Sequence, residues 1–247
     1  MPTEIEVSTA GRTREIRLNR AHKRNALTAA MYQELAAALR AAEADESISA
    51  VLISGAGAGF CAGNDLPDFL ANPPEGTNSP VGQFLTAIST LTVPVVAAVQ
   101  GAAVGVGATM LLHCDHVVAD ETAKLHFAFV PLGLVPEAAS SMLLPRAVGQ
   151  LAAARLLLLA EPVLAPAALG LGLVSEVVPA GTQLEAARAV TDRLGAQPPG
   201  ALRLTKRLLR ADPDTVAGRM AEEGALFAKQ LKGPEFTAAV TAFLQRS

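Results

Sequence analysis

An apolar run of twenty residues, 93–112, constrains this chain more than any other feature. Only Pro94, Gln100, Thr109 and several glycines interrupt it, so it has the length of a membrane-spanning helix. The glycines together with Pro94 would make a poor helix over the first two thirds of the run. A buried strand, a glycine turn and a buried helix account for it better, and we expect no membrane span.

Short strands alternate with helices along most of the chain. We expect strands at residues 51–53, 93–99, 117–119 and 124–127, and helices from Thr28, near Glu137 and over residues 151–159. Residues 5–18 alternate apolar and polar side chains around Ala10-Gly11-Arg12, which is typical of a hairpin. Alternating strands and helices favour parallel pairing through crossover connections, so the predicted fold class is α/β.

The end of the chain has a different pattern. Gln197-Pro198-Pro199-Gly200 marks the one credible boundary, and helical patterns follow it. We therefore expect an α/β core over residues 1–196 and a C-terminal helical region over residues 197–247. Residues 71–80 combine Pro, Asn, Gly and Ser, and we expect them to form an irregular surface loop.

Composition excludes several classes of protein. Of the 247 residues, 51% are hydrophobic and 17% charged, with 20 Lys+Arg against 23 Asp+Glu and no basic block. We therefore expect neither a disordered chain nor a nucleic-acid-binding surface. Two cysteines do not make a disulfide framework, and the first residues lack the charged and then apolar segments of a signal peptide. We therefore expect a reducing, cytoplasmic setting.

Several familiar motifs do not fit. Glycines at 55, 57 and 59 put the third glycine one position too early for a dinucleotide loop, and no Lys-Ser/Thr follows for a phosphate loop. His113-Cys114-Asp115-His116 lacks paired metal-ligand spacing, so we expect structural histidines and no metal. Ser140 and Ser141 lack the G-x-S-x-G turn of a serine hydrolase, although a triad assembled in space stays open.

Two glycine-rich turns and one glutamate remain as candidate chemistry. Each turn, 55–65 and 101–107, follows a buried strand and precedes a predicted helix, where backbone N–H groups are exposed. Two such groups that converge form an oxyanion hole. Glu137 lies in an apolar segment, where burial would raise its pKa towards that of a general base. Alternatively, it is an ordinary acidic residue in the first turn of a helix. The residues alone leave both interpretations open.

Four segments of the sequence carry a family resemblance. They are Asn19-Arg20…Lys23-Arg24-Asn25-Ala26-Leu27, the Phe-Cys-Ala-Gly-Asn-Asp-Leu of residues 60–66, residues 94–107, and Cys114-Asp115. Together they resemble the crotonase, or enoyl-CoA hydratase/isomerase, superfamily over nearly the whole chain. The resemblance implies a spiral of ββα units with a C-terminal helical region that helps to build a homotrimer or a dimer of trimers.

The resemblance also implies an acyl-CoA thioester as substrate, with its carbonyl oxygen held by the backbone N–H groups of Asn64 and Val106. The coenzyme A moiety would contact Arg24, Ala26 and the segment Ala62, Gly63, Asn64, Asp65 and Leu66. Lys206 would either reach the nucleotide phosphates or lie on a solvated helix face. No metal or redox cofactor is implied, because coenzyme A is part of the substrate.

The catalytic glutamates of hydratase members correspond here to Thr109 and Phe129, neither of which is a carboxylate. Phe129 would line the substrate site and help to exclude water. The segment Pro136-Glu137-Ala138-Ala139-Ser140-Ser141 is similar instead to Δ3,Δ2-enoyl-CoA isomerases of the peroxisomal type, which implies that Glu137 is the catalytic base.

We therefore expect an enoyl-CoA isomerase of fatty acid or related acyl-CoA metabolism, which converts a 3-enoyl-CoA into a 2-trans-enoyl-CoA. Two alternatives stay open. One is another reaction of the family, such as a hydratase-like one with Asp68 or Glu75 as base. The other is an acyl-CoA-binding member without catalysis.

Overall fold

A six-stranded sheet with strand order β1-β2-β3-β4-β6-β9 forms the centre of the protein. The structure is a computed structural model that describes residues 3–74, 76–210 and 212–244. The strands are β1 (Ile5–Ala10), β2 (Thr13–Leu18), β3 (Ala50–Gly55), β4 (Val95–Val99), β6 (His116–Asp120) and β9 (Glu176–Val178). β1 and β2 pair antiparallel and the later neighbours pair parallel, which confirms the predicted hairpin and α/β class.

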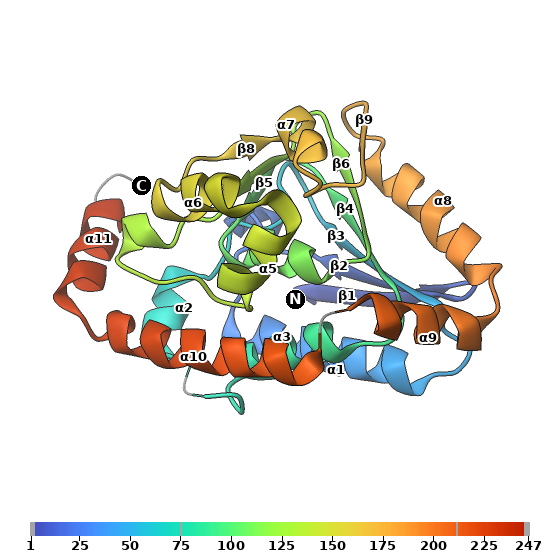
Figure 1. Cartoon of the computed structure of the whole chain (residues 1–247), viewed down its shortest axis with the longest axis horizontal. Helices are drawn as coiled ribbons and strands as arrows, with labels where there is room; N and C mark the ends of the chain where they lie inside the picture. Colours follow the sequence, from blue (N-terminus) through green and yellow to red (C-terminus); the bar gives the residue numbers. More distant parts are fainter. Residues whose placement is uncertain (1–2, 75, 211, 245–247) are drawn as a thin grey trace.

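The central strands β3, β4 and β6 are buried on both faces of the sheet, and successive residues of each strand point to opposite faces. Leu52, Val96, Ala98 and Val118 form one cluster with Ala187 of α8 (Gln183–Gly195). Their neighbours Val51, Val95, Ala97 and Val117 belong instead to the main core, which includes α1 (Ala29–Ala44) and α3 (Pro80–Thr90). Figure 1 shows α8 at the right of the sheet and α1 and α3 at the bottom.

The apolar run 93–112 folds into a strand, a turn and a buried helical segment, as predicted. β4 is followed by β5 (Ala102–Val104), then α4 (Val106–Thr109) and a 3-10 helix (Met110–His113). β5 belongs to a second, three-stranded sheet with β7 (Lys124–His126) and β8 (Val163–Leu164). None of the described helices has the length and hydropathy needed to cross a membrane.

The remaining elements before the C-terminal region are short helices. They are α2 (Leu66–Ala71), α5 (Ser140–Val148), α6 (Gln150–Leu158), α7 (Ala165–Gly170) and the 3-10 helices Ala21–Lys23 and Val130–Leu132. Thr28 caps α1 as expected, and α6 matches the predicted helix over residues 151–159. The described residues 72–74 and 76–79 form neither helix nor strand, in agreement with the predicted loop, whereas Glu75 lies outside the described residues.

The prediction of a helix beginning near Glu137 is wrong in one important respect. α5 begins at Ser140, because Ala138 and Ala139 adopt left-handed conformations with φ of 61° and 55°. Glu137 therefore lies in a turn before the helix, and its interpretation as an acid of the first helical turn is also wrong.

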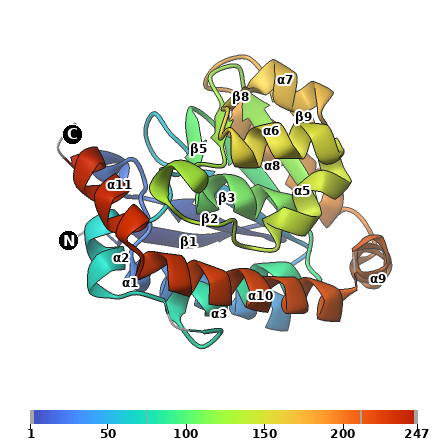
Figure 2. The ribbon, with the colours of Figure 1, turned by 60° about the vertical axis from the view of Figure 1, so that its left-hand side comes forward.

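Three helices follow the Pro-Pro-Gly segment: α9 (Pro199–Leu209), α10 (Pro213–Leu231) and α11 (Pro234–Leu244). α10 packs against α3 and α11 against the 3-10 helix Val130–Leu132. Figure 2 shows α10 running along the lower edge of the molecule between α3 and α5, with α9 set apart at its end. The part that these helices play in oligomer formation stays a prediction.

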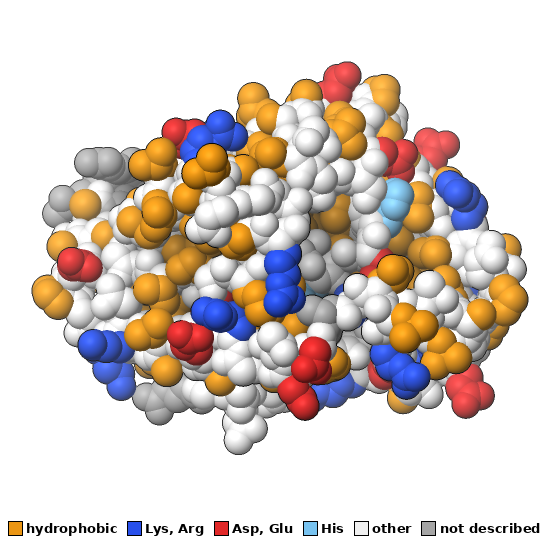
Figure 3. Space-filling model, viewed as in Figure 1, with side chains coloured by type: hydrophobic (Ala, Val, Ile, Leu, Met, Phe, Trp, Pro, Cys, Tyr) orange, Lys and Arg blue, Asp and Glu red, His pale blue; other side chains and the backbone are white. Residues whose placement is uncertain are grey.

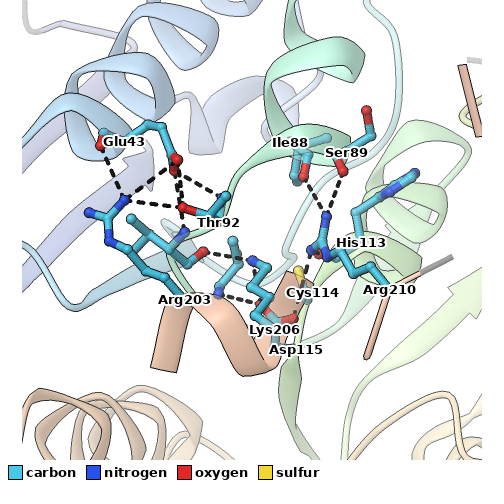
Figure 4. Close-up of polar contacts among 12 residues, drawn as sticks. Glu43, Ile88, Ser89, Thr92, His113, Cys114, Asp115, Arg203, Lys206 and Arg210 are labelled. Atoms are coloured by element: carbon cyan, nitrogen blue, oxygen red, sulfur yellow. Dashed lines mark hydrogen bonds and ion pairs between the residues drawn. The ribbon is translucent and has the colours of Figure 1, made fainter. Parts of the chain in front are cut away.

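Cationic side chains of α9 attach this helix to the core (Figure 4). Lys206 is 4% exposed; its Nζ donates to the Val93 carbonyl at 2.6 Å and lies 2.6 Å from the Asp115 carboxylate. Arg210 donates to the carbonyls of Ile88 and Ser89 at 3.1 and 2.8 Å. Both expectations for Lys206, a phosphate contact and a solvated face, are therefore wrong: burial against Asp115 makes it a structural residue.

Replacing Lys206 by Met should lower the free energy of unfolding by about 3 kcal/mol, because the substitution leaves the Val93 carbonyl and the Asp115 carboxylate without this partner. Arg207→Met, on the exposed side of the same helix, should change it by only about 0.5 kcal/mol. Urea denaturation followed by circular dichroism measures both values. Equal losses in the two variants would contradict a structural role for Lys206.

Candidate active site

Asn25 organises the loop that follows β3. It is buried in a left-handed conformation, and its side-chain amide donates to the carbonyls of Ala56, Gly59 and Phe60 at 2.8, 2.9 and 3.1 Å. The two N–H groups of one side chain are thus shared among three carbonyls of the loop. This contact joins the Arg-Asn-Ala segment to the glycine-rich loop.

The two glycine-rich turns meet side by side. The Cys61 N–H donates to the Ala102 carbonyl at 3.0 Å, and the Val104 N–H donates to the Cys61 carbonyl at 2.9 Å. A side-chain carbon at Gly107 would lie 2.6 Å from the Cys61 carbonyl oxygen, and one at Gly63 would lie 3.1 Å from the Val104 carbonyl oxygen. The two backbones approach this closely because both positions are glycine.

Asn64 and Val106 lie at this junction. The bridge between Leu27 and Asn64 uses the Gly63 carbonyl and the Asp65 N–H, so the N–H of Asn64 itself points away from Leu27. Val106 is the first residue of α4, and an N–H at that position has no acceptor within its own helix. The two turns therefore present backbone donors, the kind of group that stabilises a developing oxyanion.

Tyr32 also reaches this junction, although it was not among the residues predicted for the site. Its hydroxyl donates to Oδ1 of Asn64 at 2.5 Å from the buried face of α1. Tyr32 is the single tyrosine of the chain and lies next to Met31 in the apolar stripe of that helix. A lone hydroxyl on a buried stripe was the available signal, because such a group needs a polar partner.

Glu137 is the buried carboxylate of the site. It is 7% exposed, and its Oε1 has no hydrogen-bond partner among the residues that the structure describes. Burial raises its pKa to about 8, and the nearby Glu223 carboxylate contributes to the rise. A carboxyl group with such a pKa can both take up and release a proton near neutral pH.

Glu137 lies close enough to the loop after β3 and to α1 for its charge to act on residues of both. Burial raises the pKa of Cys61 to about 12, and the charge of Glu137 adds to that rise. The pKa of Tyr32 is raised in the same way, first by burial and then by Glu137. The fold thus brings together residues 32, 61 and 137, which belong to three separate segments of the chain.

A cavity of about 470 Å³ adjoins Glu137. Small and apolar residues of α3 and α10 form most of its wall, among them Leu85, Ala217, Met220, Ala221 and Gly224. A cavity lined in this way accepts an apolar chain and offers few partners to water. Glu137 is therefore placed where an apolar group and a proton-transferring group can meet.

The residues expected to contact coenzyme A lie in two neighbouring segments. Arg24 is exposed, and its carbonyl accepts from the Ala62 N–H at 3.0 Å, which joins the two segments. Ala26, Ala62 and Leu66 are half-buried, and Gly63 is buried. The Asp65 carboxylate is already engaged, because it lies 2.7 Å from Arg20 and caps α2.

Thr109 and Phe129, which the family resemblance matches with the hydratase glutamates, are both buried. The Thr109 hydroxyl donates to the Val106 carbonyl at 3.5 Å. Ser140 donates to the Glu137 carbonyl at 2.5 Å, so its hydroxyl serves the turn and is not poised as a nucleophile.

The histidines have structural partners. His113 contacts the Ala138 carbonyl at 2.8 Å and His116 contacts Glu176 at 3.2 Å. Since a carbonyl only accepts, Nε2 of His113 carries the proton; burial lowers the pKa of this residue to about 4, so its ring is neutral at pH 7. Within the described residues, no group of three His, Cys, Asp or Glu side chains is arranged to hold a metal ion.

Known proteins resemble this chain over nearly its whole length. The 2,3-dehydroadipyl-CoA hydratase of Escherichia coli is 33% identical over 246 residues, which cover 99% of this chain and 96% of that protein. Human enoyl-CoA delta isomerase 2 is 33% identical over 252 residues, which cover 99% of this chain and 64% of that protein. The two relatives carry different activities in their names, so likeness alone does not choose between them.

A solved structure agrees in fold. The crystal structure of an enoyl-CoA hydratase/isomerase from Pseudoalteromonas atlantica has a TM-score of 0.94 and 40% identity, covering 99% of this chain and 98% of that one. This likeness confirms the predicted crotonase-like fold. The family model described as enoyl-CoA hydratase/isomerase matches residues 10–247. The chain therefore belongs to the enoyl-CoA hydratase/isomerase family.

Proposed function

We propose that this protein is an enoyl-CoA isomerase that converts 3-enoyl-CoA thioesters into 2-trans-enoyl-CoA thioesters. The observation that carries the proposal is the Glu137 carboxyl group, which is buried beside an apolar cavity and has an unpartnered Oε1 among the described residues. The likeness to human enoyl-CoA delta isomerase 2 supports it.

In the proposed reaction Glu137 removes a proton from C2 of the acyl chain and returns it at C4. The electron pair of the broken C2–H bond delocalises into a dienolate, whose negative charge collects on the thioester oxygen. The backbone N–H groups of Asn64 and Val106 would stabilise that oxygen, and losing one such donor typically costs about 10²–10³ in rate. A single carboxyl group is enough, because the proton that leaves C2 is the one that C4 receives.

The groups around Glu137 favour isomerisation over water addition. Hydration by two carboxylates needs a second acid, and the two corresponding positions hold Thr109 and Phe129. Of the alternative bases, Asp68 accepts from the Ala29 N–H at 2.7 Å and from the Asn72 amide at 3.1 Å, so both of its oxygens are engaged in structure. Glu75 lies outside the described residues.

We propose that the enzyme acts as a homotrimer or a dimer of trimers. Large hydrophobic side chains are exposed on α6, including Leu151 and Leu158, and on α9, including Leu208 and Leu209. Figure 3 shows hydrophobic side chains gathered over these two helices on one face of the protein. Exposed apolar patches of this kind are typical of subunit interfaces.

Glu137→Gln should lower kcat for 3-enoyl-CoA isomerisation by about 10²–10⁴, because the amide removes the group that carries the proton and keeps its shape. Conversion of 3-hexenoyl-CoA, followed at the absorbance of the 2-enoyl product, measures the rate. Glu46→Gln, at an exposed position, is the matched control and should retain full activity. An undiminished rate in Glu137→Gln would overturn the proposal.

The pH dependence follows from the raised pKa of Glu137, which is about 8 instead of the ordinary 4.5. Since the base must be ionised, kcat/KM should rise with pH through an apparent pKa near 8. The folded state binds this proton more tightly than the unfolded state, so stability falls as pH rises from 4.5 to 8. As pH rises across that range, the melting temperature Tm should therefore fall less for Glu137→Gln than for the wild type.

Hydration is the second candidate, favoured by the likeness to the 2,3-dehydroadipyl-CoA hydratase. Water addition to crotonyl-CoA should be slower than isomerisation by about 10² or more, since Thr109 and Phe129 cannot position the water as a carboxylate would. Loss of the 2-enoyl absorbance reports this reaction. Hydration as fast as isomerisation would favour a hydratase, and tight binding of both thioesters without turnover would favour a non-catalytic member.

A further inference from the structure

A second buried glutamate, Glu223, reaches the turn that carries Glu137. It belongs to α10 and is 5% exposed. Its Oε2 accepts from the Ala139 N–H at 2.7 Å and its Oε1 accepts from the Ser141 N–H at 2.9 Å. The carboxylate therefore binds the first N–H groups of α5, across more than eighty residues of sequence.

The turn that Glu223 binds is unfavourable by itself. Ala138 and Ala139 are both left-handed, a conformation that side-chain-bearing residues avoid because Cβ crowds the following carbonyl. Two such residues in succession persist only where surrounding contacts hold them. The turn belongs to the site, because Ala138 and the preceding Glu137 both line the cavity.

The contacts that hold the turn come from three directions. Ser140 donates to the Glu137 carbonyl through its hydroxyl and its N–H, at 2.5 and 3.0 Å. His113 donates to the Ala138 carbonyl at 2.8 Å. Glu223 takes the two N–H groups, so its removal would leave two buried donors without this acceptor.

We propose that Glu223 is the positioning residue of the catalytic base: it holds the left-handed turn at Ala138–Ala139 and places a second carboxylate beside Glu137 within the apolar interior. This inference rests on the proposed role of Glu137 in proton transfer. It adds a function for α10, whose Ala217, Ala221 and Gly224 line the cavity while Glu223 orients the base. One helix thus connects the substrate cavity with the chemistry.

The charges around Glu137 make this role measurable. Tyr32 of α1 and Cys61 of the neighbouring loop are both protonated at neutral pH, since burial raises the pKa of each. His113 is neutral there because burial lowers its pKa to about 4. Arg219 acts on Glu223, where it opposes the rise in pKa that burial causes. Glu223 is thus the neighbouring group whose charge disfavours ionisation of Glu137.

Glu223→Gln tests the inference, because it keeps the shape of the side chain and removes its charge. The apparent pKa of the acidic limb in the pH profile of kcat/KM should fall by about one unit, since a like charge beside Glu137 is lost. The value of kcat should fall about tenfold or more, because the NH2 group that replaces one carboxylate oxygen cannot accept from the N–H group it faces, so the base is displaced. Glu222→Gln, the adjacent exposed residue that pairs with Arg219 at 3.2 Å, is the matched control and should leave both quantities unchanged.

Isotope-edited infrared titration of the glutamate carboxyl groups provides a readout that does not need turnover. The band lost in Glu137→Gln identifies Glu137, and the same band should titrate at lower pH in Glu223→Gln. An unchanged titration together with an unchanged limb of the profile would overturn the inference, even if Glu223→Gln were less stable. If Glu137→Gln remained active, the proposed function would fail, while the infrared shift would still report the coupling between the two glutamates.

Discussion

The close approach of two backbone turns is the constraint on which the site depends. Residues 61–64 and 104–107 touch through main-chain atoms, and a side chain at Gly107 would collide with the Cys61 carbonyl at 2.6 Å. The parallel sheet makes this meeting possible, because β3 and β4 are neighbours and both turns follow their carboxyl ends. The N–H groups of Asn64 and Val106 thereby belong to adjoining turns although they are far apart in sequence.

The second requirement is a carboxyl group kept away from water. Glu137 is surrounded by residues from α1, the loop after β3 and α10, and this burial raises its pKa to about 8. An exposed glutamate would be ionised at neutral pH and a weak base. The free energy that the fold expends on burying Glu137 is the physical basis of its proposed role in proton transfer.

Local patterns predicted the framework of the fold well. The hairpin, the parallel strands, the cap at Thr28 and the helices after Pro199 follow from alternation, capping and proline placement, which act within a few residues. The start of α5 was misjudged, because the left-handed conformation of Ala138 and Ala139 depends on Glu223, His113 and Ser140. α2 and α3 were not predicted, since each has a proline within its first two residues and lies beside an irregular segment.

The site was predictable only in part. The glycine spacing and Glu137 stand out in the sequence, because glycines and an isolated carboxylate are conspicuous within an apolar chain. Tyr32 and Glu223 do not, since each looks like an ordinary helical residue until the fold brings it to Asn64 or Ala139. Lys206 was wrongly predicted for the opposite reason. A lysine on a predicted helix suggests a side chain that faces solvent or binds a phosphate, yet its partners are Val93 and Asp115.

The proposed use of main-chain donors at residues 64 and 106 separates two properties of the site. Any amino acid other than proline supplies the same N–H group, so the side chains at these positions are free to vary. Val106 is buried, and Asn64 contacts Tyr32 through its side chain. Substitutions at these two positions can therefore change the side chains around the proposed donors while the N–H groups persist, which gives a lineage a route to new substrates without rebuilding its chemistry.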